Sequence, residues 1–116
     1  MKVTQKNIEP GIVVLEMTGR FMMGRDCLQL DRDMEARIAR GEKNFIFDLS
    51  GVDHVDSAAV GQIVKSFSTL KKSGGMLRLA GAVGMVDRAL TLTQVNKAIE
   101  VYPTVQEAAA KFSPAT

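Results

Sequence analysis

The 116-residue chain is poor in the residues from which several kinds of functional site are built. It has one cysteine, one histidine and no tryptophan, and aromatic residues make up 5% of it. Cys27 cannot form an intramolecular disulfide, and without a second cysteine it offers no thiolate pair for structural zinc. We expect Cys27 to be a small buried side chain, and we predict neither a metal nor a cofactor.

Long hydrophobic runs and patches of one charge sign are also missing. No apolar stretch approaches the ~20 residues that span a bilayer, and the opening MKVTQKNIEPG lacks the apolar core of a secretory signal. The 15 basic and 13 acidic residues leave a net charge of +2, and the two signs are interleaved, as in DRDMEARIARGEK. We therefore expect a cytoplasmic protein that neither inserts into membranes nor binds nucleic acid.

What the chain does contain is typical of a soluble globular protein. Hydrophobic residues make up 46% and charged residues 24% of it, a usual balance for a chain that buries a core. Its length fits one ordinary domain and is too short for two. We predict a single domain over residues 1–116, with a frayed tail at 113–116.

The pattern of apolar residues predicts alternating strands and helices. Runs of β-branched and apolar residues predict strands at 3–8, 12–19, 44–50, 76–80 and 98–102, of which the polar first one lies at an edge. Apolar residues at intervals of three and four predict helices at 27–40, 58–73, around 86–90 and around 105–112. This order predicts an α/β fold, a mixed and mostly parallel sheet of about five strands covered by about four helices.

The stretch DLSGVDHVDSAAVG, residues 48–61, is the most informative part of the chain. We interpret it as the loop between a strand and the longest helix, a position where α/β proteins carry their sites. Asp56 or Ser57 can cap the helix by accepting a hydrogen bond from a first-turn amide. The Ser57 hydroxyl can also be modified, and the small Ala58 and Ala59 leave room for a second protein. The two interpretations do not exclude each other.

This stretch resembles the signature of the STAS domain, the fold of anti-sigma factor antagonists and of sulfate transporter tails. In that signature an apolar residue, Asp and Ser are followed by a small residue, a glycine, an aliphatic residue and a glycine. The segments MTGRF, KKSGGMLRLAG and LTLTQVNKAIEVYPTVQEAAAKF also fall where the family has similar ones. The resemblance therefore covers nearly the whole chain and implies a single STAS-like domain.

The resemblance also implies a mechanism, partner switching. In the family the serine after the Asp, here Ser57, is phosphorylated by a partner kinase that is itself the anti-sigma factor. The unmodified protein binds this serine kinase and frees a sigma factor, and phosphorylation breaks the complex until a phosphatase reverses it. The chain would be a ligand and a substrate, and not an enzyme. The implied contact residues are Met22, Met23, Gly24, Asp56, Ser57, Ala58, Ala59 and Val60.

Two positions depart from the family pattern. The glycine two places after the serine is Ala59 here, a mild change because alanine suits a helix better than glycine. The acidic residue that is common in the loop after the second strand falls at Met22 or Met23, so a charge is missing and the partner or its affinity differs. These methionines are either adaptable partner contacts or pack under the first helix.

Other functions find less support in the sequence. A second hypothesis is a STAS accessory subunit that holds together a lipid-transport or stress-signalling assembly without phosphorylation.

His54 lies between Asp53 and Asp56, but no second histidine and no nucleophile-base-orienter set accompany it. GAVG, residues 81–84, lacks the third glycine and the lysine of a phosphate loop, so we predict a turn. Arg78, inside an apolar strand, either reaches out of the sheet or pairs with an acid.

Overall fold

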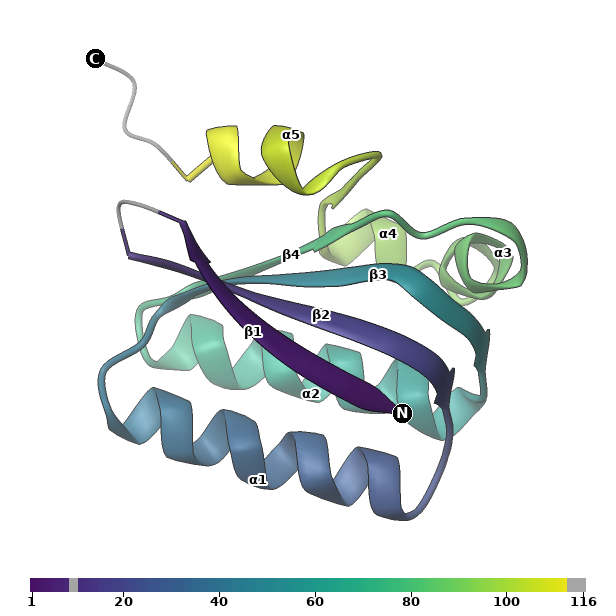
Figure 1. Ribbon diagram of the computed structural model, residues 1–116, viewed down its shortest axis with the longest axis horizontal. Coiled ribbons are helices and arrows are strands. Elements are labelled where there is room, and N and C mark those ends of the chain that lie inside the picture. Colours follow the sequence, from purple (N-terminus) through teal and green to yellow (C-terminus); the bar gives the residue numbers. More distant parts are fainter. Residues whose placement is uncertain (9–10, 113–116) are drawn as a thin grey trace.

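A computed structural model describes residues 1–8 and 11–112, and shows one mixed sheet between helices (Figure 1). The strands are β1 (Lys2–Ile8), β2 (Ile12–Phe21), β3 (Asn44–Val55), β4 (Met76–Ala80) and β5 (Val101–Tyr102). The helices are α1 (Arg25–Ala39), α2 (Ser57–Lys72), α3 (Gly84–Leu92), α4 (Val95–Ala98) and α5 (Val105–Ala110). The predicted α/β fold is confirmed. The expected fraying of 113–116 lies outside the described residues.

The strands lie in the order β1-β2-β3-β4-β5. β1 runs antiparallel to β2, and every other neighbouring pair is parallel. A parallel pair requires a crossover between its strands, and the helices supply these connections. β1 is an edge strand, as its polar sequence predicts, and all its residues except the half-buried Ile8 are exposed.

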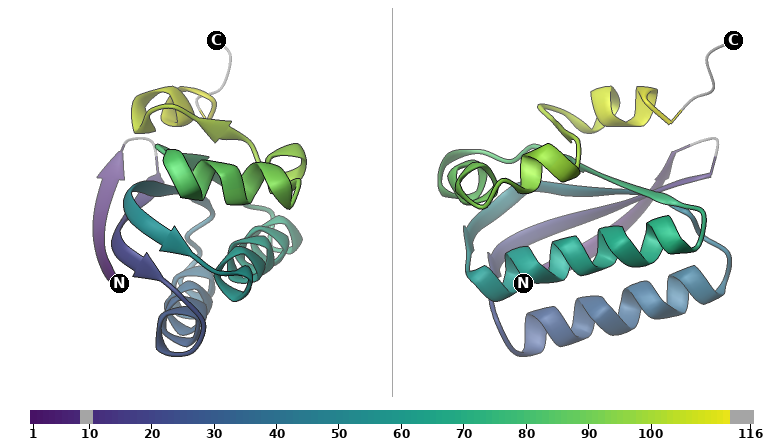
Figure 2. Two further views of the ribbon diagram at one scale, coloured as in Figure 1. Left: turned by 90° about the vertical axis from the view of Figure 1, so that its right-hand side faces the viewer. Right: turned by 180° about the vertical axis from the view of Figure 1, so that it is seen from behind.

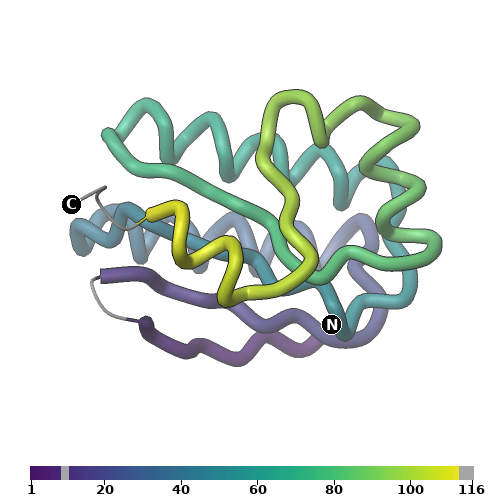
Figure 3. Tube along the Cα trace, turned by 90° about the horizontal axis from the view of Figure 1, so that it is seen from above, coloured from purple at the N-terminus to yellow at the C-terminus, as the bar shows by residue number. Residues whose placement is uncertain are grey.

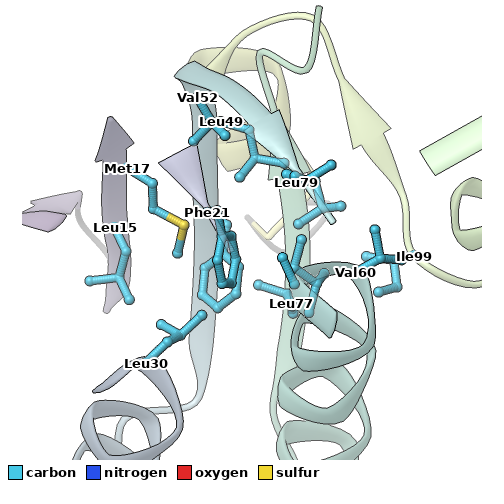
Figure 4. Packing of buried hydrophobic residues seen from close by; sticks show 14 of the residues in the cluster. Leu15, Met17, Phe21, Leu30, Leu49, Val52, Val60, Leu77, Leu79 and Ile99 are labelled. Atoms are coloured by element: carbon cyan, nitrogen blue, oxygen red, sulfur yellow. The ribbon is translucent and has the colours of Figure 1, made fainter. Parts of the chain in front are cut away.

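The two faces of the sheet are covered unequally. Figure 1 shows α1 and α2 side by side under one face, α5 on the other face, and α3 and α4 near one end of the strands; the view from above in Figure 3 shows α5 crossing only part of its face. The larger cluster of buried residues lies on the α1 and α2 face, where Leu15, Met17 and Phe21 meet Leu30 and Leu77 (Figure 4). A smaller cluster under α5 contains Ile12, Val14, Ile46, Ala80, Ala108 and Ala109.

Alternation along β2 explains this division. Val13, Leu15 and Met17 point to the larger cluster, while Ile12 and Val14 belong to the smaller one. Successive side chains of a strand point to opposite faces, so an unbroken apolar run is suited to a strand with helices on both sides. The interpretation of 44–50 as such a strand is confirmed, because β3 contributes Phe45 and Phe47 to one cluster and Ile46 to the other.

Three boundaries differ from the sequence prediction. β2 reaches Phe21, and β3 continues through 51–55, which we predicted to be loop. The register of the β2–β3 pair shifts twice, between Glu16 and Thr18 and between Gly19 and Arg20. These irregularities break the alternation of buried residues in this part of β3, so periodicity does not reveal the strand.

The third difference lies near the carboxyl terminus. The predicted strand at 98–102 is confined to Val101–Tyr102, and a short helix, α4, occupies Val95–Ala98. Its start requires Gln94 in the left-handed region, with φ of 61°. A four-residue helix is too short to produce the repeating apolar pattern from which helices are predicted.

The side chain of Arg78 pairs with an acid, one of the two outcomes left open by the sequence. Its Nε donates to Glu100 Oε1 at 2.7 Å, and its guanidinium lies 4.3 Å from the centre of the Phe112 ring. The hydrogen bond from Arg78 holds the pKa of the Glu100 carboxyl below its usual value. Arg78 thereby links β4 to the segments on both sides of α5.

Replacing Ser66 with alanine should stabilise the protein. The hydroxyl of this buried α2 residue has no hydrogen-bond partner among the described residues. Burying an unpaired hydroxyl costs about 1–3 kcal/mol, so the free energy of unfolding of Ser66→Ala should rise by about 1 kcal/mol. Chemical denaturation measures it, with the exposed Ser68→Ala on the same helix as the control for helix propensity. A loss of stability specific to Ser66→Ala would contradict the prediction.

The link between α1 and α2 should make part of the stability dependent on pH. Asp31 accepts from Lys65 Nζ at 3.1 Å and from Gln62 Nε2 at 3.2 Å. These bonds, with Lys65 contributing most, hold the pKa of Asp31 below its ordinary value of 3.8. The stabilisation is therefore present above pH 3.8 and is lost as the pH falls through the lower pKa of the folded state.

Asp31→Asn should therefore lower the free energy of unfolding at pH 7 by about 0.5 kcal/mol, the usual size for an exposed pair. The difference from the wild type should shrink toward zero when denaturant titrations are repeated in acid, well below pH 3.8. Glu35→Gln is the matched control, since Glu35 is exposed on the same helix and forms no ion pair among the described residues. An equal destabilisation of Asp31→Asn at both pH values would refute the assignment.

Candidate functional site

The segments that follow β2 and β3 meet at one end of the sheet. Phe21, the last residue of β2, is paired with Val55, the last residue of β3. The chain therefore leaves both strands side by side and enters α1 and α2, as the end-on view in the left panel of Figure 2 shows. This register brings the predicted contact segments 22–24 and 56–60 together, although they are more than 30 residues apart in sequence.

A close approach between β2 and β3 fixes this arrangement. At Gly51 an added Cβ would lie 2.5 Å from Thr18 Cγ2 and 3.0 Å from the Met17 carbonyl oxygen. A side chain at position 51 would therefore collide with the Thr18 side chain and crowd the Met17 carbonyl, beside the register shift in β2. A glycine is therefore required where β3 passes the irregular part of β2, five residues before Asp56.

The carboxylate of Asp56 joins the two segments. As the N-cap of α2 it accepts a hydrogen bond from Ala59 N through Oδ1, at 2.9 Å. Its other oxygen, Oδ2, accepts one from Met23 N, at 2.8 Å. Both bonds favour the ionised form, with that from Met23 the larger influence, so the pKa of Asp56 lies below 3.8. The carboxylate is charged at neutral pH.

The cap predicted at the entrance of α2 is thus Asp56, which leaves the Ser57 hydroxyl free. Ser57 is the first residue of α2 and is exposed. Among the described residues no hydrogen-bond partner of its hydroxyl is found. The oxygen lies at the positive end of a 16-residue helix, where the helix dipole favours negative charge. Ser57 is therefore open to a second protein and suited to carry an anionic group.

Met22 and Met23 differ in how far they are exposed. Met22 is half-buried, and its backbone is held by Asp26 Oδ2, 3.2 Å from Met22 N, and by the Cys27 thiol, 3.4 Å from Met22 O. Met23 is 75% exposed, beside Asp56. Gly24 follows with φ of 95°, which a side chain would disfavour, and forms the N-cap of α1. Met23 thus presents an exposed large apolar side chain on the loop that Asp56 holds beside the start of α2.

Cys27 is half-buried rather than fully buried. Burial raises the pKa of its thiol, and the nearby charges of Asp56 and Asp26 raise it further. The thiolate is the reactive form of cysteine, so this environment disfavours the reactive form of Cys27. It serves as a packing residue that also helps to hold Met22.

Two of the predicted contact residues have side chains that face the core. Ala59 is 0% exposed and Val60 is 6% exposed, and both pack into the larger cluster. Any contact that a partner makes at these two positions is therefore with the backbone of the first turn of α2 rather than with the side chains. Ala58 is half-buried and stays at the edge of the exposed surface.

Gly61 is the residue at this site that sequence reasoning missed. It is exposed one turn after Ser57, and an added Cβ there would meet no atom within 4 Å. Residues four apart on a helix lie on the same face, so Ser57 and Gly61 form a surface without bulky side chains. A glycine inside a helix costs about 1 kcal/mol relative to alanine. A glycine within the predicted helix 58–73 was therefore the sequence signal that could have drawn attention to this position.

The remaining candidates do not form a catalytic site. His54 is exposed and its Nδ1 lies 3.2 Å from the carboxylate of Asp53, which is also exposed. Within residues 1–8 and 11–112 no three potential metal ligands gather. A cavity of about 530 Å³ lies between β1 and α1, and its lining residues do not include Ser57. The turn predicted at 81–84 is not found as such, because residues 81–83 have no regular structure and Gly84 is already the first residue of α3.

No helix among the described residues is long and apolar enough to cross a bilayer. This finding agrees with the absence of long apolar runs in the sequence.

The sequence is similar to that of a known domain family and of one of its relatives. The model of the STAS domain matches residues 4–108. A Thermotoga maritima protein named "Putative anti-sigma factor antagonist" is 32% identical over 69 residues, which cover 60% of this chain and 61% of that protein. The chain thus aligns with less than two thirds of that relative's length.

Solved structures share the fold at lower identity. The crystal structure of a Thermotoga maritima protein of the same description matches with a TM-score of 0.87 and 23% identity, covering 94% of this chain and 92% of that one. The anti-sigma factor antagonist SpoIIAA matches in its unphosphorylated form, with a TM-score of 0.73 and 16% identity over 95% of this chain and 96% of that one. The structure of Bacillus SpoIIAA in its phosphorylated form matches with a TM-score of 0.75 and 15% identity, covering 97% of this chain and 100% of that one. Because the STAS domain model matches residues 4–108, which are almost the whole chain, the chain belongs to the STAS domain family.

Proposed function

We propose that this protein is an anti-sigma factor antagonist controlled by phosphorylation. The unmodified form binds an anti-sigma factor that is also a serine kinase, and thereby releases a sigma factor. The kinase transfers a phosphate to Ser57, which ends the complex until a phosphatase removes it. The protein acts in the cytoplasm as a ligand and a substrate, without catalysing a reaction itself.

The observation that carries this proposal is the free hydroxyl of Ser57 at the exposed start of α2. The oxygen has no hydrogen-bond partner among the described residues, because Asp56 provides the helix cap. A kinase needs such a hydroxyl at the surface. The aligned Thermotoga maritima relative is named for anti-sigma antagonism, and SpoIIAA has been solved with and without its phosphate.

The electrostatics of the site support a switch in docking rather than in folding. A phosphate brings about −1.5 to −2 charge next to Asp53 and Asp56. The positive end of α2 offsets part of the repulsion, so the fold tolerates the group. A partner seated over Ser57 would meet this concentrated negative charge, and a surface that fits the neutral hydroxyl would be rejected.

The surface around Ser57 also indicates what the partner presents. The exposed Met23 offers a flexible apolar contact, and the bare face at Gly61 allows close approach of a backbone. We expect the kinase to place an apolar pocket over Met23 and a main-chain segment along the first turns of α2. A methionine, either Met22 or Met23, stands where the family resemblance led us to expect an acidic side chain.

Phosphorylation should occur at Ser57 and should weaken binding. Incubation with ATP and a candidate anti-sigma serine kinase should add one phosphate, located at Ser57 by mass spectrometry of peptides. Ser57→Ala should remain unmodified and still bind the kinase with ADP. Ser57→Glu should bind on the order of tenfold or more weakly, because like charges brought together at an interface are costly.

The exposed Ser68 on α2 serves as the internal control for kinase specificity. If saturating kinase leaves the protein unmodified while stable binding persists, the scaffold function without phosphorylation gains support. Modification at a serine other than Ser57 would refute the assignment of the switch.

Gly61→Ala should make the protein more stable and yet a weaker ligand. The added methyl meets no atom of the chain, so the free energy of unfolding should rise by about 0.5–1 kcal/mol. The same methyl would stand between α2 and a closely seated partner. Binding measured by calorimetry should weaken by about tenfold, as expected for an overpacked contact. Ser68→Ala, which also raises helix propensity, should leave the affinity unchanged. Unaltered binding by Gly61→Ala would show that the partner does not cross this turn.

A further inference from the structure

One carboxylate bridges the β2–α1 loop and the first turn of α2. Asp56 accepts hydrogen bonds from Met23 N and Ala59 N, two amides from segments 33 and 3 residues away along the chain. The other hydrogen bonds of the loop are local, since Asp26, Cys27 and Leu28 all lie within five residues of their loop partners. Among the described residues, the bond between Asp56 and Met23 is the hydrogen bond that ties the loop to α2.

The loop needs such a tie if Met23 is to contribute to binding. Its side chain is 75% exposed, so packing within the protein does little to fix it. Gly24 directly after it adopts a φ of 95°, and glycine gives the backbone wide conformational freedom. A flexible contact residue loses conformational entropy when a partner orders it, and this loss reduces affinity. Holding the Met23 backbone in advance avoids part of that loss.

We propose that Asp56 is a positioning residue for partner binding, whose carboxylate holds Met23 beside Ser57 so that the two form one preorganised docking surface. This inference rests on the proposed function, since it concerns the same docking surface. Asp56 acts through Met23 and is not itself the contact. The helix needs only one of its two oxygens, and the second is committed to the loop.

Asparagine at position 56 separates these two tasks. Asparagine caps helices as well as aspartate does, so its carbonyl oxygen can keep the bond to Ala59 N. The second position then carries an NH₂ group, which cannot accept a hydrogen bond from Met23 N. Asp56→Asn therefore opens the link to the loop while α2 keeps its cap. Asp53→Asn is the matched control, because it removes the same charge from a nearby exposed carboxylate that does not bond to the loop.

The first measurement uses the protein alone. Hydrogen exchange of the Met23 amide, followed by NMR, should be about fivefold faster in Asp56→Asn, as loss of a hydrogen bond worth about 1 kcal/mol predicts. The Ala59 amide should keep its protection, and Asp53→Asn should change neither. Unchanged exchange at Met23 in Asp56→Asn would overturn the proposal, whether or not any partner is known.

The second measurement is a double-mutant cycle with Met23→Ala, using the candidate serine kinase and ADP. Asp56→Asn and Met23→Ala should each weaken binding by about tenfold, and the double variant should bind no more weakly than Met23→Ala alone. Coupling of this kind shows that one residue acts through the other. Effects that multiply would overturn the proposal by making Asp56 an independent contact. Failure of the wild type to bind would count against the proposed function, and the amide exchange would still decide the role of Asp56.

Discussion

The parallel pairing of β2 and β3 beyond Gly51 is the constraint on which the site depends. Without the register that sets Phe21 beside Val55, the residues after the two strands would leave the sheet at different places. The close approach at Gly51 and Thr18 maintains this pairing through an irregular stretch of sheet. Asp56 then completes the arrangement with a charged group that accepts from two backbone amides. The proposed docking surface therefore depends first on the register of β2 and β3, and then on the side chain of Asp56.

Much of the fold could be predicted because its signals repeat. The apolar runs of β2, β3 and β4 and the periodic faces of α1 and α2 each extend over several residues, and neighbouring positions reinforce one another. The edge position of β1 was identifiable from its polar sequence. The errors arose where repetition fails. The irregular pairing hid the end of β3, and α4 has four residues, too few to show a period.

The candidate site was located from sequence, but its internal geometry was not. The position of Asp56 and Ser57 at a helix entrance followed from the strand-to-helix transition and from the resemblance to the STAS domain. Which of the two caps the helix depends on a backbone conformation, with φ of −109° and ψ of 178° at Asp56, that sequence does not specify. The bond to Met23 joins segments more than 30 residues apart. Likewise, the burial of Ala59 and Val60 depends on how α2 is rotated against the sheet.

The unequal covering of the two sheet faces determines which part of the molecule opens most easily. α5 has six residues and contributes two alanines to the smaller cluster, whereas α1 and α2 contribute larger side chains to the main one. Elements that bury little apolar surface open at a low cost in free energy. Transient detachment of α5 would uncover Ile12, Val14 and Ile46, and it would occur on the opposite side of the sheet from α1 and α2 (Figure 1). Such sub-global opening would leave the larger cluster and the α1–α2 layer in place, so the surface proposed to bind a partner would keep its shape.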